Sequence, residues 1–286
     1  MKIDINTKMI TLLGKPLGQS FAARMQNAGY EAAGLNMLYF YTEVDKDHLG
    51  DVVNGLRYMN FAGFAVTKPN KVRVLRYLDE LDPLCKKMGA SNTVVKTPEG
   101  KLIGYNTDGV GFYTSLVEER KINVEESTFF CFGAGGAGRA MCSVLAYHGA
   151  KKIYITDFYE PCAESLVMDI NENFAPVAEL VHHGDYAKIA ECNVVMNASG
   201  IGMGSTIGQT PMPVEHIQPG QFYFDACYNP DKTQFLLNAE EKGCQVLNGL
   251  GMSLYQGAAQ IELWTGEKAP VEAMRKELMD ILAESK

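Results

Sequence analysis

The sequence of 286 residues has no long apolar run, no excess of basic residues and no paired cysteines. A membrane-spanning helix needs about 20 consecutive apolar residues, and no run in this sequence approaches that length. The first residues, Met-Lys-Ile-Asp-Ile-Asn-Thr-Lys, mix charged and apolar side chains and so differ from a secretory signal peptide. These absences predict a cytoplasmic protein that does not enter a membrane.

The charge and the cysteine pattern exclude further classes of protein. A formal net charge of −8 argues against nucleic acid as a partner, because contacts with a phosphate backbone require a basic surface. The seven cysteines contain no Cys-x-x-Cys pair and are odd in number, so we expect reduced thiols rather than a zinc site or a set of disulfides. His182 and His183 would point to opposite faces of a strand, so we predict no metal site. The oligomeric state is left open, with a homodimer as one option.

The most informative stretch is glycine-rich and lies near the middle of the chain. Residues 129–132 have the composition of a buried strand, residues 139–148 that of a helix, and Gly133, Gly135 and Gly138 lie between them. This pattern is typical of a dinucleotide-binding turn: the first glycine permits a tight turn, the second lets a pyrophosphate approach, and the third lets the helix pack on the strand. The N–H groups at the start of the helix favour phosphate. The predicted phosphate-binding residues are Gly133, Ala134, Gly135, Gly136, Ala137 and Gly138.

The end of the next predicted strand bears on which dinucleotide binds. Asp157 lies 19 residues after Gly138, close to the offset of ~20 residues at which a carboxylate meets the adenosine ribose. Such a carboxylate repels a 2′-phosphate, whereas an NADP site usually supplies an arginine. Phe158, Tyr159 and Glu160 follow, and none is a cation. We therefore predict NAD in preference to NADP, the alternative being a lysine that reaches the site from elsewhere in the chain.

Strands alternate with helices along the first part of the chain, which predicts an α/β fold with a parallel sheet. The predicted strands are residues 9–13, 37–44 and 61–67, followed by a hairpin of residues 91–95 and 101–105. The predicted helices are residues 20–34, capped by Ser20, then 47–58, a third from Pro69 towards Leu84, and 109–120.

A second series of strands and helices follows a polar linker at residues 121–127. Its strands complete a doubly wound sheet of the Rossmann type, and two helices end the chain. The further strands are predicted at residues 151–157, 179–182, 193–197, 222–226 and 245–247. The further helices are predicted at residues 162–173, 187–192, 233–242, 252–264 and 271–285.

Two residues are candidates for proton transfer. An enzyme that oxidises an alcohol with a nicotinamide needs an acid or base beside the carbinol. Lys71 and Asp108 suit this role, since each ends an unusual polar loop, at residues 66–71 and 104–108. A lysine in the first turn of a helix is usually solvated, however, and an aspartate before a helix is usually an N-cap. The residues alone leave both interpretations open.

Eight motifs, in order, give the chain a resemblance to the shikimate/quinate dehydrogenase family along nearly its whole length. They lie at residues 14–20, 66–71, 89–93, 104–108, 133–138, 197–203, 225–230 with Thr233, and 251–256. The resemblance implies a substrate domain of residues 1–108 with 250–286, to which the C-terminal helices return, and a Rossmann domain of residues 109–249. It also implies an NAD(P)-dependent, reversible hydride transfer at a ring hydroxyl of shikimate or quinate, as in the shikimate pathway of aromatic amino acid biosynthesis.

The resemblance further implies roles for individual residues. Lys71 would transfer the proton, and Asp108 would contact the same hydroxyl. The remaining substrate-binding residues would be Ser20, Thr67, Asn92, Tyr228 and Gln256. The residues at the nicotinamide end would be Asn197, Ala198, Ser199, Met203, Gly249 and Met252.

The chain departs from the family pattern where the substrate carboxylate would bind. The family's Ser-x-Ser is here Ser20-Phe-Ala22, and its Asn-Val-Thr is Ala65-Val-Thr. Each lost hydrogen bond removes ~0.5–1.5 kcal/mol of binding free energy. Either Lys15, Lys68 or a backbone N–H replaces these contacts, or the substrate differs at this end. We favour the second, with quinate or a related ring acid ahead of shikimate.

Two alternatives to this enzyme remain. One is a dehydrogenase of the same build that acts on a different class of substrate. The other is a non-catalytic sensor of NAD and a ring acid, against which the presence of both Lys71 and Asp108 argues.

Overall fold

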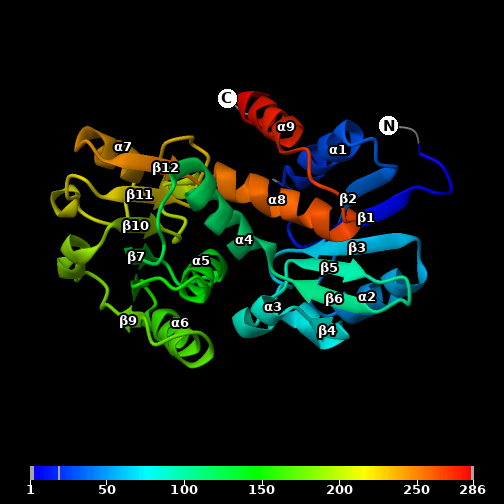
Figure 1. The fold of residues 1–286 in the computed structure, drawn as a ribbon, viewed down its shortest axis with the longest axis horizontal. Coiled ribbons are helices and arrows are strands. Elements are labelled where there is room, and N and C mark those ends of the chain that lie inside the picture. Colours follow the sequence, from blue (N-terminus) through cyan, green and yellow to red (C-terminus); the bar gives the residue numbers. More distant parts are fainter. Residues whose placement is uncertain (1–2, 19, 285–286) are drawn as a thin grey trace. The chain divides into compact units, whose positions relative to one another are not determined.

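The computed structural model describes residues 3–18 and 20–284, which divide into two compact units (Figure 1). Unit 1 comprises Met1–Gly111 and Leu254–Lys286, and unit 2 comprises Phe112–Ser253. The boundaries expected from the sequence, after residues 108 and 249, lie three and four residues earlier. Each unit contains one six-stranded sheet.

Unit 1 has a mixed sheet with the strand order β2-β1-β3-β5-β6-β4. Its strands are β1 (Lys8–Gly14), β2 (Met37–Glu43), β3 (Phe61–Val66), β4 (Glu80–Leu81), β5 (Thr93–Lys96) and β6 (Leu102–Tyr105). The expectation of a parallel sheet is confirmed for β1, β2 and β3, and the predicted hairpin is confirmed by the antiparallel pairing of β5 with β6. Strand β5 also runs antiparallel to β3, which the sequence pattern does not predict. The short turn after β5 accounts for the hairpin, since so few residues can join only antiparallel strands.

The helices of unit 1 are amphipathic and cover this sheet. They are α1 (Ala22–Ala32), α2 (Leu49–Tyr58), α3 (Pro83–Met88), α4 (Thr107–Thr114), which ends in unit 2, α8 (Leu250–Thr265), which begins there, and α9 (Val271–Glu284). Leu49, Val53 and Leu56 recur at helical spacing on α2 and are buried against Phe64 and Val94 of the sheet in one apolar cluster. Burial of such a stripe holds the helix on the sheet.

The C-terminal helices belong to unit 1, as the family resemblance implies. Trp264 of α8 donates its indole N–H to the carbonyl of Val94 on β5, at 3.0 Å. Helix α9 lies beside α1 (Figure 1), where Arg24 pairs with Glu277 and Glu284. The two ends of the chain are therefore joined in one core.

The segment 69–84 is not the single helix that the sequence predicts. It contains a short 3-10 turn (Arg73–Tyr77), strand β4 and the start of α3. Asp79 accepts hydrogen bonds from the Arg57 guanidinium and from the backbone N–H of Leu102, and these contacts draw the chain onto the sheet. Asp82 then caps α3, because a residue before proline disfavours the helical conformation.

Three other predicted boundaries are wrong. Helix α1 begins at Ala22 with Phe21 as its N-cap, and the Ser20 hydroxyl accepts the N–H of Ala22 at 3.3 Å. The predicted helix 109–120 begins at Thr107 and changes after Thr114 into a π-helical segment (Ser115–Glu119). Strand β9 ends at Leu180, so both histidines lie beyond the strand, His183 in a turn.

Unit 2 has a wholly parallel sheet with the strand order β12-β11-β10-β7-β8-β9, the doubly wound arrangement that the sequence predicts. Its strands are β7 (Thr128–Phe132), β8 (Lys152–Thr156), β9 (Ala178–Leu180), β10 (Val194–Asn197), β11 (Phe222–Asp225) and β12 (Gln245–Asn248). Its helices are α5 (Gly136–Tyr147), α6 (Glu160–Asn173) and α7 (Gln234–Glu241), with 3-10 turns at Ala187–Glu191, Gly204–Thr206 and Val214–His216. Every residue of β7 is buried, as expected of a central parallel strand.

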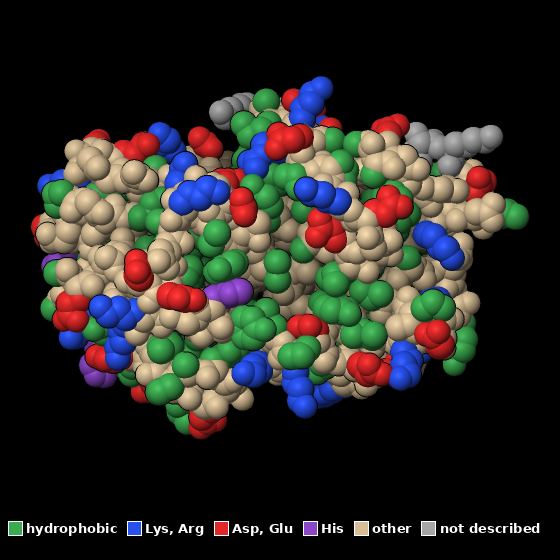
Figure 2. All heavy atoms as spheres, viewed as in Figure 1, with side chains coloured by type: hydrophobic (Ala, Val, Ile, Leu, Met, Phe, Trp, Pro, Cys, Tyr) green, Lys and Arg blue, Asp and Glu red, His purple; other side chains and the backbone are tan. Residues whose placement is uncertain are grey.

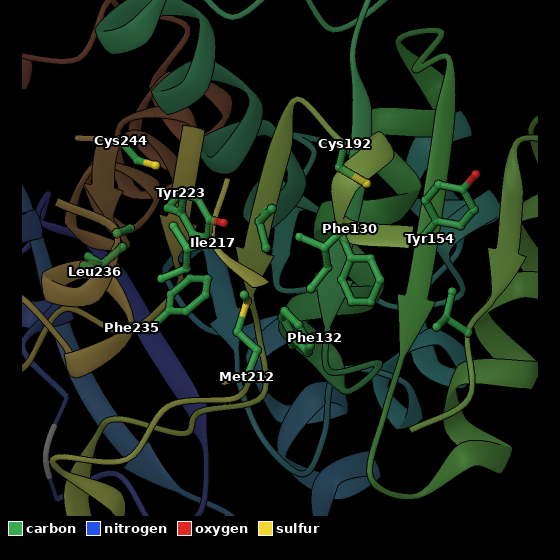
Figure 3. Close-up of a cluster of buried hydrophobic side chains, with 14 residues drawn as sticks. Phe130, Phe132, Tyr154, Cys192, Met212, Ile217, Tyr223, Phe235, Leu236 and Cys244 are labelled. Atoms are coloured by element: carbon green, nitrogen blue, oxygen red, sulfur yellow. The ribbon is translucent and has the colours of Figure 1, made fainter. Parts of the chain in front are cut away.

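Aromatic side chains fill the core of unit 2 (Figure 3). Tyr223 of β11 packs edge-on against Phe235 of α7 with ring centroids 5.3 Å apart, and Phe132 of β7 contacts the same ring at 6.4 Å. The cluster packs α7 against the sheet.

On the face shown in Figure 2, Lys and Arg side chains are interspersed with Asp and Glu side chains. No helix within residues 3–18 and 20–284 is long and apolar enough to cross a membrane. Over the same residues, no three His, Cys, Asp or Glu side chains are grouped as metal ligands.

Candidate active site

Lys71 and Asp108 form an ion pair within unit 1. The Lys71 ammonium donates to Asp108 Oδ2 at 2.7 Å, and the two side chains are 29% and 17% exposed. Both are thus largely withdrawn from water but still reachable by a small molecule. An ammonium beside a carboxylate can pass a proton to or from a bound hydroxyl.

The local backbone explains why these side chains are available. Asn106, not Asp108, caps helix α4, because its Oδ1 accepts the N–H groups of Asp108 at 3.2 Å and Gly109 at 3.5 Å. The Asp108 carboxylate is thereby spared the capping role that an aspartate often takes. Lys71 lies in a turn rather than in a helix, and its carbonyl accepts the N–H of Ser91 at 2.9 Å.

Asn92 joins the pair from the start of β5. Its side-chain Nδ2 donates to Asp108 Oδ1 at 3.0 Å and lies 3.4 Å from Gln256 Oε1 on α8. Its Oδ1 accepts the backbone N–H of Thr107 at 2.7 Å. The structure therefore brings together Lys71, Asp108, Asn92 and Gln256, four of the residues predicted from the family resemblance.

The residues predicted near the substrate carboxylate make their contacts with other parts of unit 1. Ser20 is held by Tyr41, whose hydroxyl donates to the Ser20 carbonyl at 2.6 Å and accepts the N–H of Ala23 at 3.0 Å. Ala65 is buried, so its methyl group offers no polar contact, and Lys15 pairs with Asp45 at 3.0 Å.

Two further substrate-binding residues, Thr67 and Tyr228, stay predictions. Thr67 packs so closely against Gly14 that a Cβ at Gly14 would lie 2.4 Å from its methyl carbon. Tyr228 belongs to unit 2, and burial raises the pKa of its hydroxyl to about 12.

The glycine-rich turn of unit 2 has the geometry of a phosphate-binding loop. Gly133 has a φ of +99°, a conformation that other residues rarely adopt, and a Cβ there would lie 2.6 Å from the backbone N of Ser199. A Cβ at Gly138 would lie 1.9 Å from the carbonyl oxygen of Gly133. Gly135 and Gly136 are exposed at the start of α5, with no atom near their missing side chains. A pyrophosphate can therefore approach the free N–H groups of this helix.

Asp157, the predicted ribose ligand, also holds the glycine-rich turn. Its Oδ2 accepts the N–H of Ala134 at 2.7 Å, and its Oδ1 accepts that of Tyr159 at 2.9 Å. Glu160 follows, and a backbone hydrogen bond from His183 is the main reason why its pKa lies below the ordinary value. The negative charges of Asp157 and Glu160 thus lie beside the end of β8.

Asn197 lies at the end of β10 and is wholly buried. Its Nδ2 donates to both carboxylate oxygens of Asp225 at 3.1 Å and to the carbonyl of Ile201 at 2.8 Å, while its Oδ1 accepts the Ser199 hydroxyl at 2.6 Å. The side chain therefore shapes the loop that carries three other predicted cofactor residues, Ala198, Ser199 and Met203. Met203 is 41% exposed.

The remaining two predicted cofactor residues lie where β12 passes into α8. A Cβ at Gly249 would lie 2.1 Å from the carbonyl oxygen of Ala226, so the chain passes close to the end of β11 here. Met252 is half-buried in the first turn of α8.

The sequence motifs assign no role to the buried residues that support Asn92 by hydrogen bonds. Thr93, Thr107, Gln26 and Gln260 are buried and connected to Asn92 by hydrogen bonds. The Gln260–Thr93 contact joins residues 167 positions apart. No local pattern signals such a contact.

Comparisons with known proteins agree with this geometry. The model of the shikimate dehydrogenase substrate binding domain matches residues 12–94, and that of the shikimate 5'-dehydrogenase C-terminal domain matches residues 249–279. The shikimate dehydrogenase (NADP(+)) of Desulforamulus reducens is 40% identical over 281 residues, which cover 97% of this chain and 96% of that protein.

Solved structures match over the same length. The shikimate 5-dehydrogenase of Listeria monocytogenes, in complex with shikimate and NAD, has a TM-score of 0.93 and 37% identity, with coverage of 97% of this chain and 98% of that one. A 5-ketofructose reductase of Gluconobacter has a TM-score of 0.88 and 31% identity, with coverage of 97% and 100%. These matches confirm the resemblance predicted from the motifs. The chain therefore belongs to the shikimate dehydrogenase family of NAD(P)-dependent oxidoreductases.

Proposed function

We propose that this chain interconverts a ring alcohol and its ketone, with Lys71 and Asp108 as the catalytic residues. The observation that carries the proposal is the Lys71–Asp108 pair at 2.7 Å, partly exposed and bonded to Asn92. Asp108 and Asn92 would orient the hydroxyl, and Lys71 Nζ would take its proton during oxidation and return it during reduction. Bound nicotinamide supplies the hydride acceptor. Gly133, Gly135 and Gly138 support its binding, because they open the start of α5 to a pyrophosphate.

The test replaces the proton-transfer lysine and compares it with another paired lysine. Lys71→Met should lower kcat at least 100-fold, since general acid–base groups contribute about 10²–10⁴, and should leave the Kd for NAD(H) unchanged in a fluorescence titration. Lys232→Met is the matched control, because Lys232 also lies 2.7 Å from a carboxylate but on the surface of unit 2. Full activity of Lys71→Met would refute the proposed chemistry.

The cofactor of this chain, on our proposal, is NAD in preference to NADP. Asp157 and Glu160 support this choice, because their charges oppose a 2′-phosphate, and Phe158 occupies the position of a cation. The names of the curated relatives carry NADP(+) and so favour NADP, whereas the Listeria structure holds NAD, and our choice rests on the residues of this chain. Titration with both cofactors is the test, and tighter binding of NADPH than of NADH would overturn the choice. Phe158→Arg should shift the preference towards NADP.

The substrate, on our proposal, makes fewer contacts at its acid end than shikimate makes in the usual family pattern. Ala22 and Ala65 support this, since neither side chain can donate a hydrogen bond. Quinate or a related ring acid is our first choice. A substrate without a carboxylate is the second, favoured by the likeness to a 5-ketofructose reductase, because that sugar carries none.

A panel of shikimate, quinate, 5-ketofructose and fructose separates these choices. Turnover of shikimate far above all the others would refute the altered acid end. Ala22→Ser should lower the KM for shikimate severalfold, since one neutral hydrogen bond contributes ~0.5–1.5 kcal/mol, and it should leave the KM for 5-ketofructose unchanged.

A further inference from the structure

We infer that Thr93 and Gln260 are positioning residues, which hold Asn92 and through it Asp108 in the orientation that faces Lys71. The inference rests on the proposed function, because it concerns the same Lys71–Asp108 pair. Both residues are nearly inaccessible, with Thr93 0% and Gln260 3% exposed. Neither can touch a substrate, so any effect on turnover must pass through the residues that they contact, Asn92 above all.

A series of hydrogen bonds runs from Gln26 through Gln260 and Thr93 to Asn92, and the carbonyl of Gly257 decides which atom donates at each step. The carbonyl of Gly257 can only accept, so the Gln26 amide must place its Nε2 there, at 3.1 Å. The second hydrogen of Nε2 then donates to Gln260 Oε1 at 2.9 Å. This orientation leaves Gln26 Oε1 buried without a partner. The orphaned oxygen is a consequence of the direction that Gly257 imposes.

Gln260 in turn determines which way the hydrogen bond to Thr93 of β5 runs. Because its Oε1 accepts from Gln26, its Nε2 must face Thr93, and it donates to the Thr93 hydroxyl at 3.0 Å. The Thr93 hydroxyl keeps one hydrogen, and Asn92 Oδ1 accepts it at 2.9 Å. The Thr107 hydroxyl lies 3.1 Å from the Thr93 hydroxyl and can donate to it. Asn92 Oδ1 also accepts the backbone N–H of Thr107.

These contacts determine the orientation of the Asn92 side-chain amide. With its carbonyl oxygen held by two donors, its Nδ2 must donate outward to Asp108 Oδ1. Asp108 Oδ2 is left for the Lys71 ammonium. Helix α8 thus fixes the catalytic carboxylate through three side chains, and a buried network of this kind specifies one arrangement.

Two substitutions at Thr93 separate positioning from packing. Thr93→Val keeps the shape and removes the hydroxyl, whereas Thr93→Ser keeps the hydroxyl and removes a methyl group. We expect Thr93→Val to lower kcat roughly tenfold with little change in the KM for NAD, while Thr93→Ser retains most of kcat. The assay uses shikimate, or quinate if the wild-type chain turns it over faster.

A primary deuterium isotope effect gives an independent readout. A loosened Asp108 slows the chemical step, so the isotope effect on kcat with substrate deuterated at the carbinol carbon should rise in Thr93→Val and in Gln260→Met. The double variant should lose little more than either single one, because both changes break the same chain of bonds. A change in stability alone would not raise the isotope effect.

Gln221 provides the matched control. It is also a buried glutamine, 6% exposed, whose Nε2 donates to the carbonyls of Ile189 and Cys192 in unit 2. Gln221→Met should lower the thermal midpoint without changing the isotope effect.

Three outcomes overturn the inference: Thr93→Val equal to the wild type, Thr93→Ser as impaired as Thr93→Val, or an isotope effect in Gln260→Met that matches the control. If Lys71→Met is inactive in any of these cases, only the positioning role fails. An active Lys71→Met would instead remove the proposed function itself.

Discussion

Two carboxylates, Asp108 in unit 1 and Asp225 in unit 2, show how one kind of side chain serves different ends. Asp225 is wholly buried and accepts only from neutral donors: Asn197, the N–H of Cys227 and the Thr233 hydroxyl. Asp108 is 17% exposed and accepts from a charged donor, Lys71. Asp225 stabilises the fold of unit 2 by joining three neighbouring segments. Asp108, with Lys71, stays accessible to a ligand that exchanges a proton.

The difference teaches that burial and the charge of the partner, not the number of hydrogen bonds, distinguish the two roles. Burial raises the pKa of Asp225, and the hydrogen bonds from Thr233, Cys227 and Asn197 only oppose that rise. A fully bonded carboxylate without access to solvent or substrate cannot exchange protons during turnover. Substitutions at the two positions should therefore affect different properties.

The largest expected effect is on activity at Asp108. Asp108→Asn presents an amide to the Lys71 ammonium and should lower kcat about 10²–10⁴-fold. The thermal midpoint should change little, because the Lys71 side chain is 29% exposed and can be solvated. Steady-state kinetics and a melting curve check this, with Glu240→Gln as a control that breaks a surface pair at 2.7 Å. An unfolded Asp108→Asn would make the two carboxylates alike and end the contrast.

The next effect is on stability at Asp225. Asp225→Asn turns an amide NH₂ towards donors that are buried, and each mismatched buried group costs ~1–3 kcal/mol. The free energy of unfolding should fall by about 2–4 kcal/mol in urea denaturation. In the protein that remains folded, kcat should stay within severalfold of the wild type. A stable but inactive Asp225→Asn would show that this carboxylate takes part in turnover.

The contrast between the two carboxylates was only partly visible in the sequence. The glycine spacing and the alternation of strands and helices predicted the doubly wound sheet of unit 2, because both depend on short-range sterics and burial. The motif order correctly pointed to the family. In unit 1 the hairpin of β5 and β6 is readable from the sequence, whereas the antiparallel pairing of β5 with β3 is not, since it depends on contacts between distant segments.

The site shows the same division. Lys71 and Asp108 were named from their loops, but the residue that caps α4 was not, and Asn106 rather than Asp108 fills that place. Gln260 lies on a helix far along the chain, and only the fold reveals its contact with Thr93. Local chemistry is readable from local sequence, whereas the support behind a site is a property of the tertiary structure.

A smaller effect is expected at Thr233, which donates to Asp225 at 2.6 Å and caps α7. Thr233→Val should lower the free energy of unfolding by about 1–2 kcal/mol, the cost of one buried hydrogen bond and a cap. Thr233→Ser keeps the hydroxyl and should lose less. Equal losses in the two variants would place the effect in the methyl group and weaken the account of Asp225.

The smallest effect is the contribution of Asp225 to the pH dependence of stability, which a comparison of the wild type with Asp225→Asn isolates. Its folded-state pKa lies above the ordinary value of 3.8 because of burial, so the unfolded chain releases this proton at lower pH than the folded one. The contribution of Asp225 to stability is therefore full below about 3.8 and is lost as the pH rises through the folded-state pKa. Denaturant unfolding of the wild type and Asp225→Asn, at several pH values upwards from the most acidic one at which both fold, should show the gap between them narrowing as the pH rises. A gap that widens with pH would mean that the buried carboxylate is stabilised in its charged form, like a carboxylate with a cationic partner, and would reverse the contrast with Asp108.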